Sequence, residues 1–312
     1  MQTHLSTIYK HLCISLPFSI LLAAPTIVNA QVRVLALGDS ITQGTKGQKS
    51  YRHPLIMGIG DALGCSYEMV GSRDQNNATN DVQPDFVSYH EGYSGHRADW
   101  FTEGRASPSN PGIDAIMDAE TPDIVLIHLG SNDMRNGFPV GTNPIGPNDY
   151  NPNGSGSTIA ELDQLVTQIW SKNANAELFV ANLIPWYGTA PNSNVTADVQ
   201  DLGDEIETWI STENNPRLHL VDVRSGYDQG YTPGASTHPR MISDLVHPNS
   251  DGEAHIADAF LAAIEQASIC ASSAPGGPLF QEAEGATLVG GNWVIVNDNS
   301  CLLYTSPSPR DS

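Results

Sequence analysis

The stretch V-R-V-L-A-L-G-D-S-I, at residues 32–41, decides the fold that we predict for this chain. Its apolar part, 32–37, predicts a buried strand, because β-branched and aliphatic residues continue until Gly38 interrupts them. The turn that follows leaves the hydroxyl of Ser40 at the carboxyl edge of a sheet, where open α/β folds bind their ligands. Gly-Asp-Ser alone is more typical of an ordinary turn, so its meaning depends on residues further along the chain.

Strand-like and helix-like apolar patterns alternate after this stretch. Strands are predicted at 67–70, 123–129, 177–183 and 218–223, and helices at 53–63, 113–119, 158–172, 195–210 and 250–267. Thr158 and Glu161 form a capping box that is expected to start the helix at 158. Polar loops occupy 72–97 and 130–156. The alternation predicts an α/β fold, a three-layer α/β/α sandwich around a parallel sheet.

The composition excludes some partners and indicates a folded chain. Hydrophobic residues make up 39% of the 312 residues and charged residues 16%, which is enough apolar material for a sizeable core. The formal net charge of −21 argues against nucleic acid as a partner, because little would neutralise its phosphates.

The first thirty residues are typical of a secretory signal peptide. Lys10 precedes an apolar stretch, 12–24, and the small residues that end at Ala30 predict cleavage after that position. The mature protein is therefore expected to be extracellular, with no membrane association after signal removal. Cys65 and Cys270 are able to pair in an oxidising compartment, although two isolated thiols fit the sequence equally well.

The composition and the sequence pattern of the chain change after the domain predicted at 31–270. Residues 271–278 have the composition of a linker. Residues 279–300 resemble the opening of a β-sandwich carbohydrate-binding module and are too few to form one, so the module is expected to be truncated. Residues 301–312 resemble the translation of a sequencing adapter, and we exclude them from the fold.

A serine hydroxyl needs a base to become a nucleophile, and a histidine oriented by a carboxylate is the usual one. Of the ten histidines, His247 follows Asp244 by three residues just before a helix. One loop can then bring the carboxylate to Nδ1 and direct Nε2 at Ser40. We therefore predict Ser40, His247 and Asp244 as the catalytic residues, although Asp-x-x-His-Pro also occurs in plain turns.

Acyl transfer also needs hydrogen-bond donors for the developing oxyanion. Asn132 follows the buried strand at 123–129 and is expected at the same sheet edge as Ser40. Gly95, in E-G-Y-S-G at 91–95, is able to offer a backbone N–H at close range. Each of these residues also fits a simple turn.

Together, Ser, Gly, Asn and the Asp/His pair occur in the chain order of the SGNH (GDSL) hydrolases, and the chain resembles them over residues 31–268. The resemblance implies a flavodoxin-like sheet, Ser40 as the nucleophile, His247 as the base and Asp244 as its orienting acid. It also implies an oxyanion hole made of Ser40, Gly95 and Asn132. No Gly-x-Ser-x-Gly motif occurs in the chain, which argues against a nucleophile-elbow α/β-hydrolase.

Within that superfamily, S-Y-R-H-P-L at 50–55, V-G-S at 70–72, E-G-Y-S-G at 91–95 and L-G-S-N-D-M at 129–134 resemble carbohydrate esterase family three. The resemblance implies a polysaccharide deacetylase, most of the family being acetylxylan esterases. The chain departs from that family at Y-S-G-H, 93–96, and in the long loop 137–156. Aromatic residues in the loops are candidates to stack on sugar rings, namely Tyr51, Tyr93, Trp186 and Trp100, the last equally suited to the core.

The predicted function is secreted ester hydrolysis on an acetylated polysaccharide, without a metal or organic cofactor. A lipase or lysophospholipase on the same scaffold and a non-catalytic carbohydrate-binding protein are the alternatives. The loop around Asp149 to Glu161 partly matches a calcium-binding loop, but the acid that should close it falls one residue late, and a solvated loop is the better interpretation.

Overall fold

A computed structural model describes the chain over residues 31–44, 50–74, 88–104, 111–138, 140 and 157–270. The predicted signal peptide, linker, truncated module and adapter-like tail lie outside these residues. So does most of the loop that we compared with a calcium site.

A six-stranded sheet forms the centre of the domain, and all its strand pairings are parallel. The strands run in the order β2-β1-β4-β5-β6, and the two-residue β3 pairs with the end of β1. Their bounds are β1 Val32–Gly38, β2 Tyr67–Val70, β3 Glu91–Gly92, β4 Ile124–His128, β5 Glu177–Ala181 and β6 Leu218–Val221. The predicted buried strand at 32–37 is therefore a central strand.

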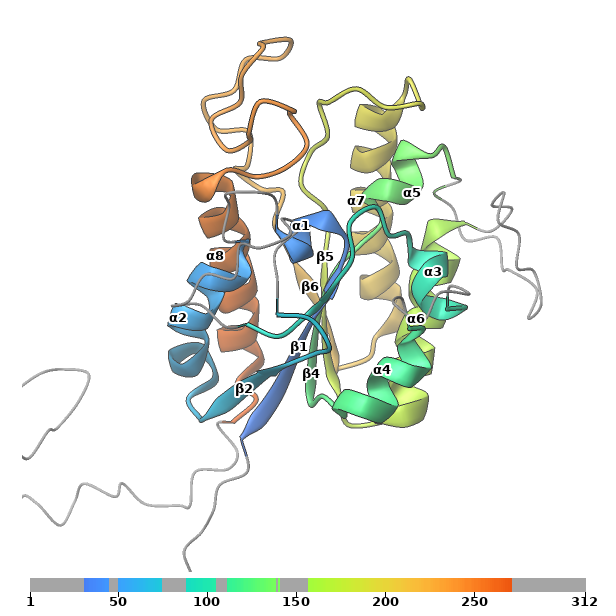
Figure 1. The fold of residues 1–312 in the computed structure, drawn as a ribbon, viewed down its shortest axis with the longest axis vertical. Coiled ribbons are helices and arrows are strands. Elements are labelled where there is room, and N and C mark those ends of the chain that lie inside the picture. The colour runs from blue at the N-terminus through green and yellow to red at the C-terminus, as the bar shows by residue number, and fades with distance from the viewer. Residues whose placement is uncertain are drawn as a thin grey trace, which may run out of the picture.

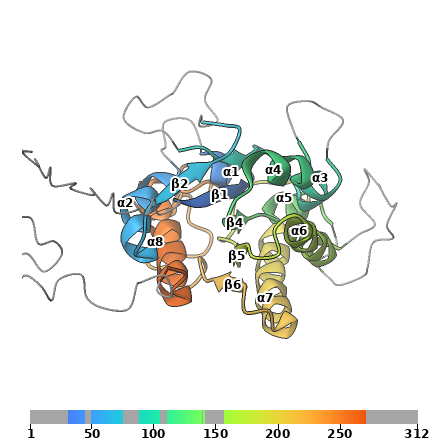
Figure 2. The same ribbon diagram turned by 90° about the horizontal axis from the view of Figure 1, so that it is seen from below.

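Helices cover both faces of the sheet, so the predicted three-layer architecture is confirmed (Figures 1 and 2). One face carries α2 (Arg52–Leu63) and α8 (Ser250–Ala267), which pack against each other. The other face carries α4, α6 and α7. The bounds of the remaining helices are α1 Ser40–Gln43, α3 Ala98–Thr102, α4 Ile113–Glu120, α5 Ser131–Arg135, α6 Thr158–Lys172 and α7 Val195–Glu213.

The core lies on both sides of the sheet, because the side chains of a strand alternate between its two faces. In β4, Val125 and Ile127 join the apolar cluster beneath α4, α6 and α7, while Ile124 and Leu126 join the cluster beneath α2 and α8. All four side chains are fully buried. A strand buried on both faces has a continuous apolar sequence, which is why β1 and β4 were predictable.

Sequence reasoning missed the shortest elements and misplaced one cap. The strand β3 and the helix α5 fall in stretches predicted as loop, α1 follows the predicted turn after β1, and α3 lies in a stretch for which no element was predicted. Helix α6 begins at Thr158 as predicted, but its N-cap is Ser157, whose hydroxyl accepts from the N–H of Ala160. The side chain of Glu161 instead accepts a hydrogen bond from Thr102, so the predicted capping box was wrong.

A disulfide joins Cys65, between α2 and β2, to Cys270 after α8. The sequence had left this pairing open. The bond connects two points that are 205 residues apart and closes a loop that contains the elements from β2 to α8. None of the helices in the described part of the chain has both the length and the hydrophobicity to cross a membrane.

Candidate active site

The serine of the opening stretch lies where β1 ends and the short helix α1 begins. Ser40 is the first residue of α1 and is 8% exposed. The preceding Asp39 caps the helix, since its side chain accepts from the N–H of Ile41 at 2.9 Å. Because β1 ends at Gly38, this cap turns the chain at the carboxyl edge of the sheet and holds the hydroxyl there.

A loop just before α8 brings a histidine to this hydroxyl. Nε2 of His247 lies 2.8 Å from Oγ of Ser40, although the two residues are 207 positions apart. Nδ1 of His247 lies 2.6 Å from Oδ2 of Asp244. Nδ1–H donates a hydrogen bond to the carboxylate, which leaves Nε2 unprotonated to accept from the serine hydroxyl. The three side chains predicted from separate parts of the sequence are therefore in series.

Asp244 is held in place by its own loop. Its Oδ1 accepts from the backbone N–H groups of Val246 at 2.9 Å and His247 at 3.0 Å. Partial burial by itself would raise the pKa of Asp244, but these hydrogen bonds and the nearby imidazole lower it below its ordinary value. The carboxylate is therefore charged at neutral pH and fixes the orientation of the ring.

Asn132 reaches the same edge from the end of β4, as predicted. Its Nδ2 donates to Oδ2 of Asp39 at 3.1 Å, which engages one of the two amide hydrogens. Burial raises the pKa of Asp39 to about 6, against the opposing effect of its hydrogen bonds and of His247. Sequence reasoning had treated Asp39 as part of a turn and missed its contact with Asn132. The only feature of the sequence that could have pointed to a role for Asp39 in the site was its position directly before Ser40.

The backbone N–H groups of Ser40 and Gly95 are among those at the site that have no hydrogen-bond partner in the described part of the chain. Gly95 has φ +77°, a conformation that side chains disfavour, although a Cβ there would meet nothing within 4 Å. The glycine therefore serves the backbone conformation of its loop rather than close packing. The role of these two groups and of the Asn132 amide as donors to an oxyanion stays a prediction.

The aromatic residues predicted to bind sugar are core residues instead. Tyr51 is fully buried and its ring stacks on Phe260. Tyr93 is 3% exposed, with the ring of His96 stacked on it and the guanidinium of Arg73 over it. Trp186 is 6% exposed and donates its indole N–H to the carbonyl of Gly188. Rings buried in this way offer no face to a sugar, so these three predictions were wrong.

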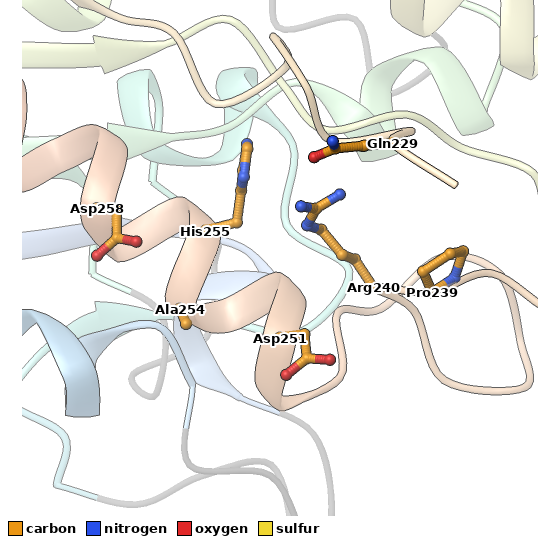
Figure 3. A pocket seen from close by; sticks show the side chains of 7 residues that line it. All are labelled: Gln229, Pro239, Arg240, Asp251, Ala254, His255 and Asp258. Carbon is orange, nitrogen blue, oxygen red and sulfur yellow. The ribbon is translucent and has the colours of Figure 1, made fainter. Parts of the chain in front are cut away.

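A cavity of about 320 Å³ lies away from these residues, where the loop after β6 folds over one side of α8 (Figure 3). It is lined by Gln229, Pro239, Arg240, Asp251, Ala254, His255 and Asp258. It shares no residue with the arrangement around Ser40. Two other histidines lie outside the arrangement around Ser40: His255 lines this cavity, and Nε2 of His238 lies 3.1 Å from Asp228.

A hydroxyl hydrogen-bonded to an imidazole that a carboxylate orients, at the carboxyl edge of a parallel sheet, is the arrangement of a hydrolase that attacks with serine. The sequence model of the GDSL-like lipase/acylhydrolase family matches residues 34–260. The chain belongs to that family, and with it to the hydrolases that cleave esters.

Known proteins outside the family model agree with this assignment. A multidomain esterase from Ruminococcus flavefaciens is 22% identical over 257 residues, which are 79% of this chain and 30% of that protein. The chain thus spans about a third of the length of this relative.

The fold is also that of solved carbohydrate esterases. A family 3 carbohydrate esterase from Talaromyces cellulolyticus is similar with a TM-score of 0.53 and 24% identity, over 76% of this chain and 97% of that one. One from Clostridium thermocellum has a TM-score of 0.53 and 22% identity, over 76% and 98% of the two chains.

Proposed function

We propose that this chain is a secreted esterase that removes acetyl groups from a polysaccharide, with acetylated xylan as the first substrate to test. The observation that carries the ester chemistry is the 2.8 Å contact between Oγ of Ser40 and Nε2 of His247. The sequence resemblance to carbohydrate esterase family three, and the likeness in fold to the two family 3 esterases, support the acetyl-sugar substrate.

In the proposed reaction Ser40 attacks the carbonyl carbon of the acetyl ester while Nε2 of His247 takes the hydroxyl proton. Asp244 stabilises the imidazolium that forms. The negative charge on the carbonyl oxygen is met by the N–H groups of Ser40 and Gly95 and by the amide of Asn132. When the intermediate collapses, the sugar oxygen leaves with the proton from His247, and Ser40 keeps the acetyl group.

Deacylation repeats these steps with water. His247 takes a proton from water, and the oxygen attacks the acetyl carbon. The second intermediate collapses to acetate, and the proton returns to Oγ of Ser40. Acylation and deacylation together consume only the ester and one water molecule.

Export is a separate part of the proposal. The disulfide between Cys65 and Cys270 supports it, because such bonds persist in oxidising compartments outside the cytosol. A signal peptide removed after Ala30 would leave a mature chain that begins at Gln31, next to β1. The N-terminal sequence of the protein recovered from culture medium tests this.

A series of p-nitrophenyl esters from acetate to decanoate, run beside acetate release from acetylated xylan, tests the substrate. We expect the highest kcat/KM with acetate, and release of acetate from the xylan. A maximum at octanoate or longer would favour the lipase alternative and refute the acetyl specificity. Absence of turnover with every ester would favour the carbohydrate-binding alternative.

A further inference from the structure

A buried glutamine connects the helix of the nucleophile to the loop of the glycine donor. Gln43 is the last residue of α1 and is 5% exposed. Its Oε1 accepts from the backbone N–H of Ser94 at 2.7 Å, across 51 positions of sequence. Ser94 directly precedes Gly95, so this side chain reaches the segment that presents the proposed oxyanion donor.

The backbone of Gln43 has little freedom to move. The buried guanidinium of Arg52 donates to the carbonyls of Thr42 at 2.8 Å and Gln43 at 3.2 Å. The same guanidinium donates a third bond, at 2.6 Å, to the carbonyl of Ser88. Ser88 lies three residues before the start of β3. On the other side, a Cβ at Gly92 would lie only 2.5 Å from the backbone nitrogen of Gln43. The glycine is therefore needed for α1 to lie directly against β3.

The backbone N–H groups around Gly95 are engaged on both sides of it. The N–H of Tyr93 donates to the carbonyl of Gly38 at 2.9 Å, and the N–H of His96 donates to the carbonyl of Tyr93 at 3.0 Å. The N–H of Ser94 donates to Gln43, and that of Gly95 has no partner in the described chain. Of these anchors, the bond to Gln43 is the one that a side-chain substitution can remove.

We propose that Gln43 is a positioning residue that aims the N–H of Gly95 at the oxyanion. The inference rests on the proposed roles of Ser40 and Gly95. Oxyanion donors act at about 2.7–3.1 Å, and a misplacement of roughly 1 Å in an active site costs on the order of 100-fold in rate. The bond from Gln43 fixes Ser94, and with it the start of the peptide that carries this donor.

Gln43→Met tests the proposal, because methionine keeps the length of the side chain and removes the acceptor. Turnover of p-nitrophenyl acetate is measured per active serine, counted by titration with an organophosphonate, so that unfolded protein is not included. We expect kcat to fall roughly 10- to 100-fold while KM changes less than about threefold. The matched control is Gln168→Met, since Gln168 donates to the carbonyl of Thr102, the last residue of α3, and has no hydrogen bond to Ser94 in the described part of the chain. That variant should keep wild-type kcat.

A double-mutant cycle separates positioning from general loosening of the fold. Gly95→Ala keeps the N–H but strains its backbone, so its loss and that of Gln43→Met should overlap rather than add. Gln43→Glu keeps an acceptor oxygen for the N–H of Ser94. The Glu variant should fold, and its kcat should be higher than that of the Met variant. Additive losses, equal losses in the Gln168 control, or wild-type kcat in Gln43→Met would each overturn the proposal. Wild-type turnover in Ser40→Ala would instead overturn the proposed function.

Discussion

The two sides of the site are built differently. On the nucleophile side, Ser40 is 8% exposed, Asn132 6% and Asp39 1%. On the base side, the side chain of His247 is 23% exposed and that of Asp244 is 43% exposed. Ser40, Asn132 and Asp39 therefore belong to the core of the domain, whereas the imidazole and its carboxylate lie on a surface loop.

The two sides are also held by different kinds of contact. Asn132 contacts Asp39 across 93 positions of sequence, so the nucleophile side depends on the whole sheet. The base side is held mainly through backbone groups: the N–H of Ile242 donates to the carbonyl of His247 at 2.9 Å, and Asp244 accepts from its own loop. The N–H of Tyr187 adds one bond from outside the loop, to the carbonyl of Leu245 at 2.9 Å. Substitutions that remove the buried contact between Asn132 and Asp39 should thus change stability and rate together. Substitutions on the base side should change rate with little change in stability.

The largest effect is expected from Ser40→Ala, which removes the proposed nucleophile. We expect kcat on p-nitrophenyl acetate to fall roughly 10⁴-fold or more, because no other group can form the acyl-enzyme. The free energy of unfolding in urea should stay within about 1 kcal/mol of wild type, since only one small polar atom is lost. Retention of more than a few per cent of the turnover would show that the reaction does not use this serine.

Asp244→Asn probes the base side. Asparagine keeps an oxygen for the two backbone N–H groups but places an amide donor opposite Nδ1 of His247. The ring then takes the tautomer with a proton on Nε2, which cannot accept from Ser40. We expect kcat to fall about 10³-fold, less than in the buried protease triad because water reaches this carboxylate. The free energy of unfolding should fall by less than about 1 kcal/mol, because the contribution of this exposed carboxylate is screened by solvent.

The control for this variant is Asp251→Asn, an exposed aspartate in the first turn of α8 that should leave turnover unchanged. A loss of stability with Asp244→Asn as large as its loss of rate would remove the distinction between the two sides.

The same contrast explains what the sequence could reveal. Asp244 and His247 were predictable because three positions and one loop bring them together. The alternation of strands and helices was predictable because β1 and β4 are buried on both faces and have continuous apolar sequences. These are features that a window of ten residues contains.

Contacts between distant segments could not be predicted in this way. The bond from Gln43 to Ser94 and the pairing of β3 with β1 depend on the final arrangement of the sheet. Tyr51 and Trp186 were misassigned for a related reason, since their positions in loops say nothing about whether their rings turn into the core. The order of Ser, Gly, Asn and His along the chain still indicated that they meet at one edge.

Asn132→Ala probes the nucleophile side. Compared with Asp244→Asn, it should lower the rate less and the stability more. Losing one oxyanion donor should lower kcat about 10²-fold. The buried carboxylate of Asp39 loses a donor too, so the free energy of unfolding should fall by roughly 1–3 kcal/mol. Asn173→Ala, which removes a bond to the carbonyl of Pro122 at the C-terminus of α6, is the control for rate.

The stability loss of Asn132→Ala should depend on pH. Burial raises the pKa of Asp39 to about 6, and the amide of Asn132 opposes that rise. A raised pKa means that this group contributes stability below its unfolded pKa and loses it as the pH rises through 6. Urea unfolding at pH 5 and pH 8 should therefore give the larger difference from wild type at pH 8. An equal difference at both pH values would mean that Asp39 is not the group affected.

The smallest effect on rate is expected from Glu161→Gln. Glu161 is a buried residue in the first turn of α6. Burial and the nearby carboxylates of Asp99 and Glu103 raise the pKa of Glu161 to about 7. Wild-type stability should therefore fall as the pH rises from the unfolded pKa of the glutamate through 7, where the buried side chain becomes charged. Glutamine keeps an acceptor for the hydroxyl of Thr102 without that charge, so the variant should be more stable than wild type at pH 8 by roughly 1–3 kcal/mol and equally stable at pH 4.

Glu205→Gln, on an exposed position of α7, is the control and should show no such gain in stability, and both variants should keep wild-type kcat. A gain at pH 8 that came with a loss of turnover would mean that this part of the core is coupled to the chemistry, and that the nucleophile side extends further into the domain than its hydrogen bonds indicate.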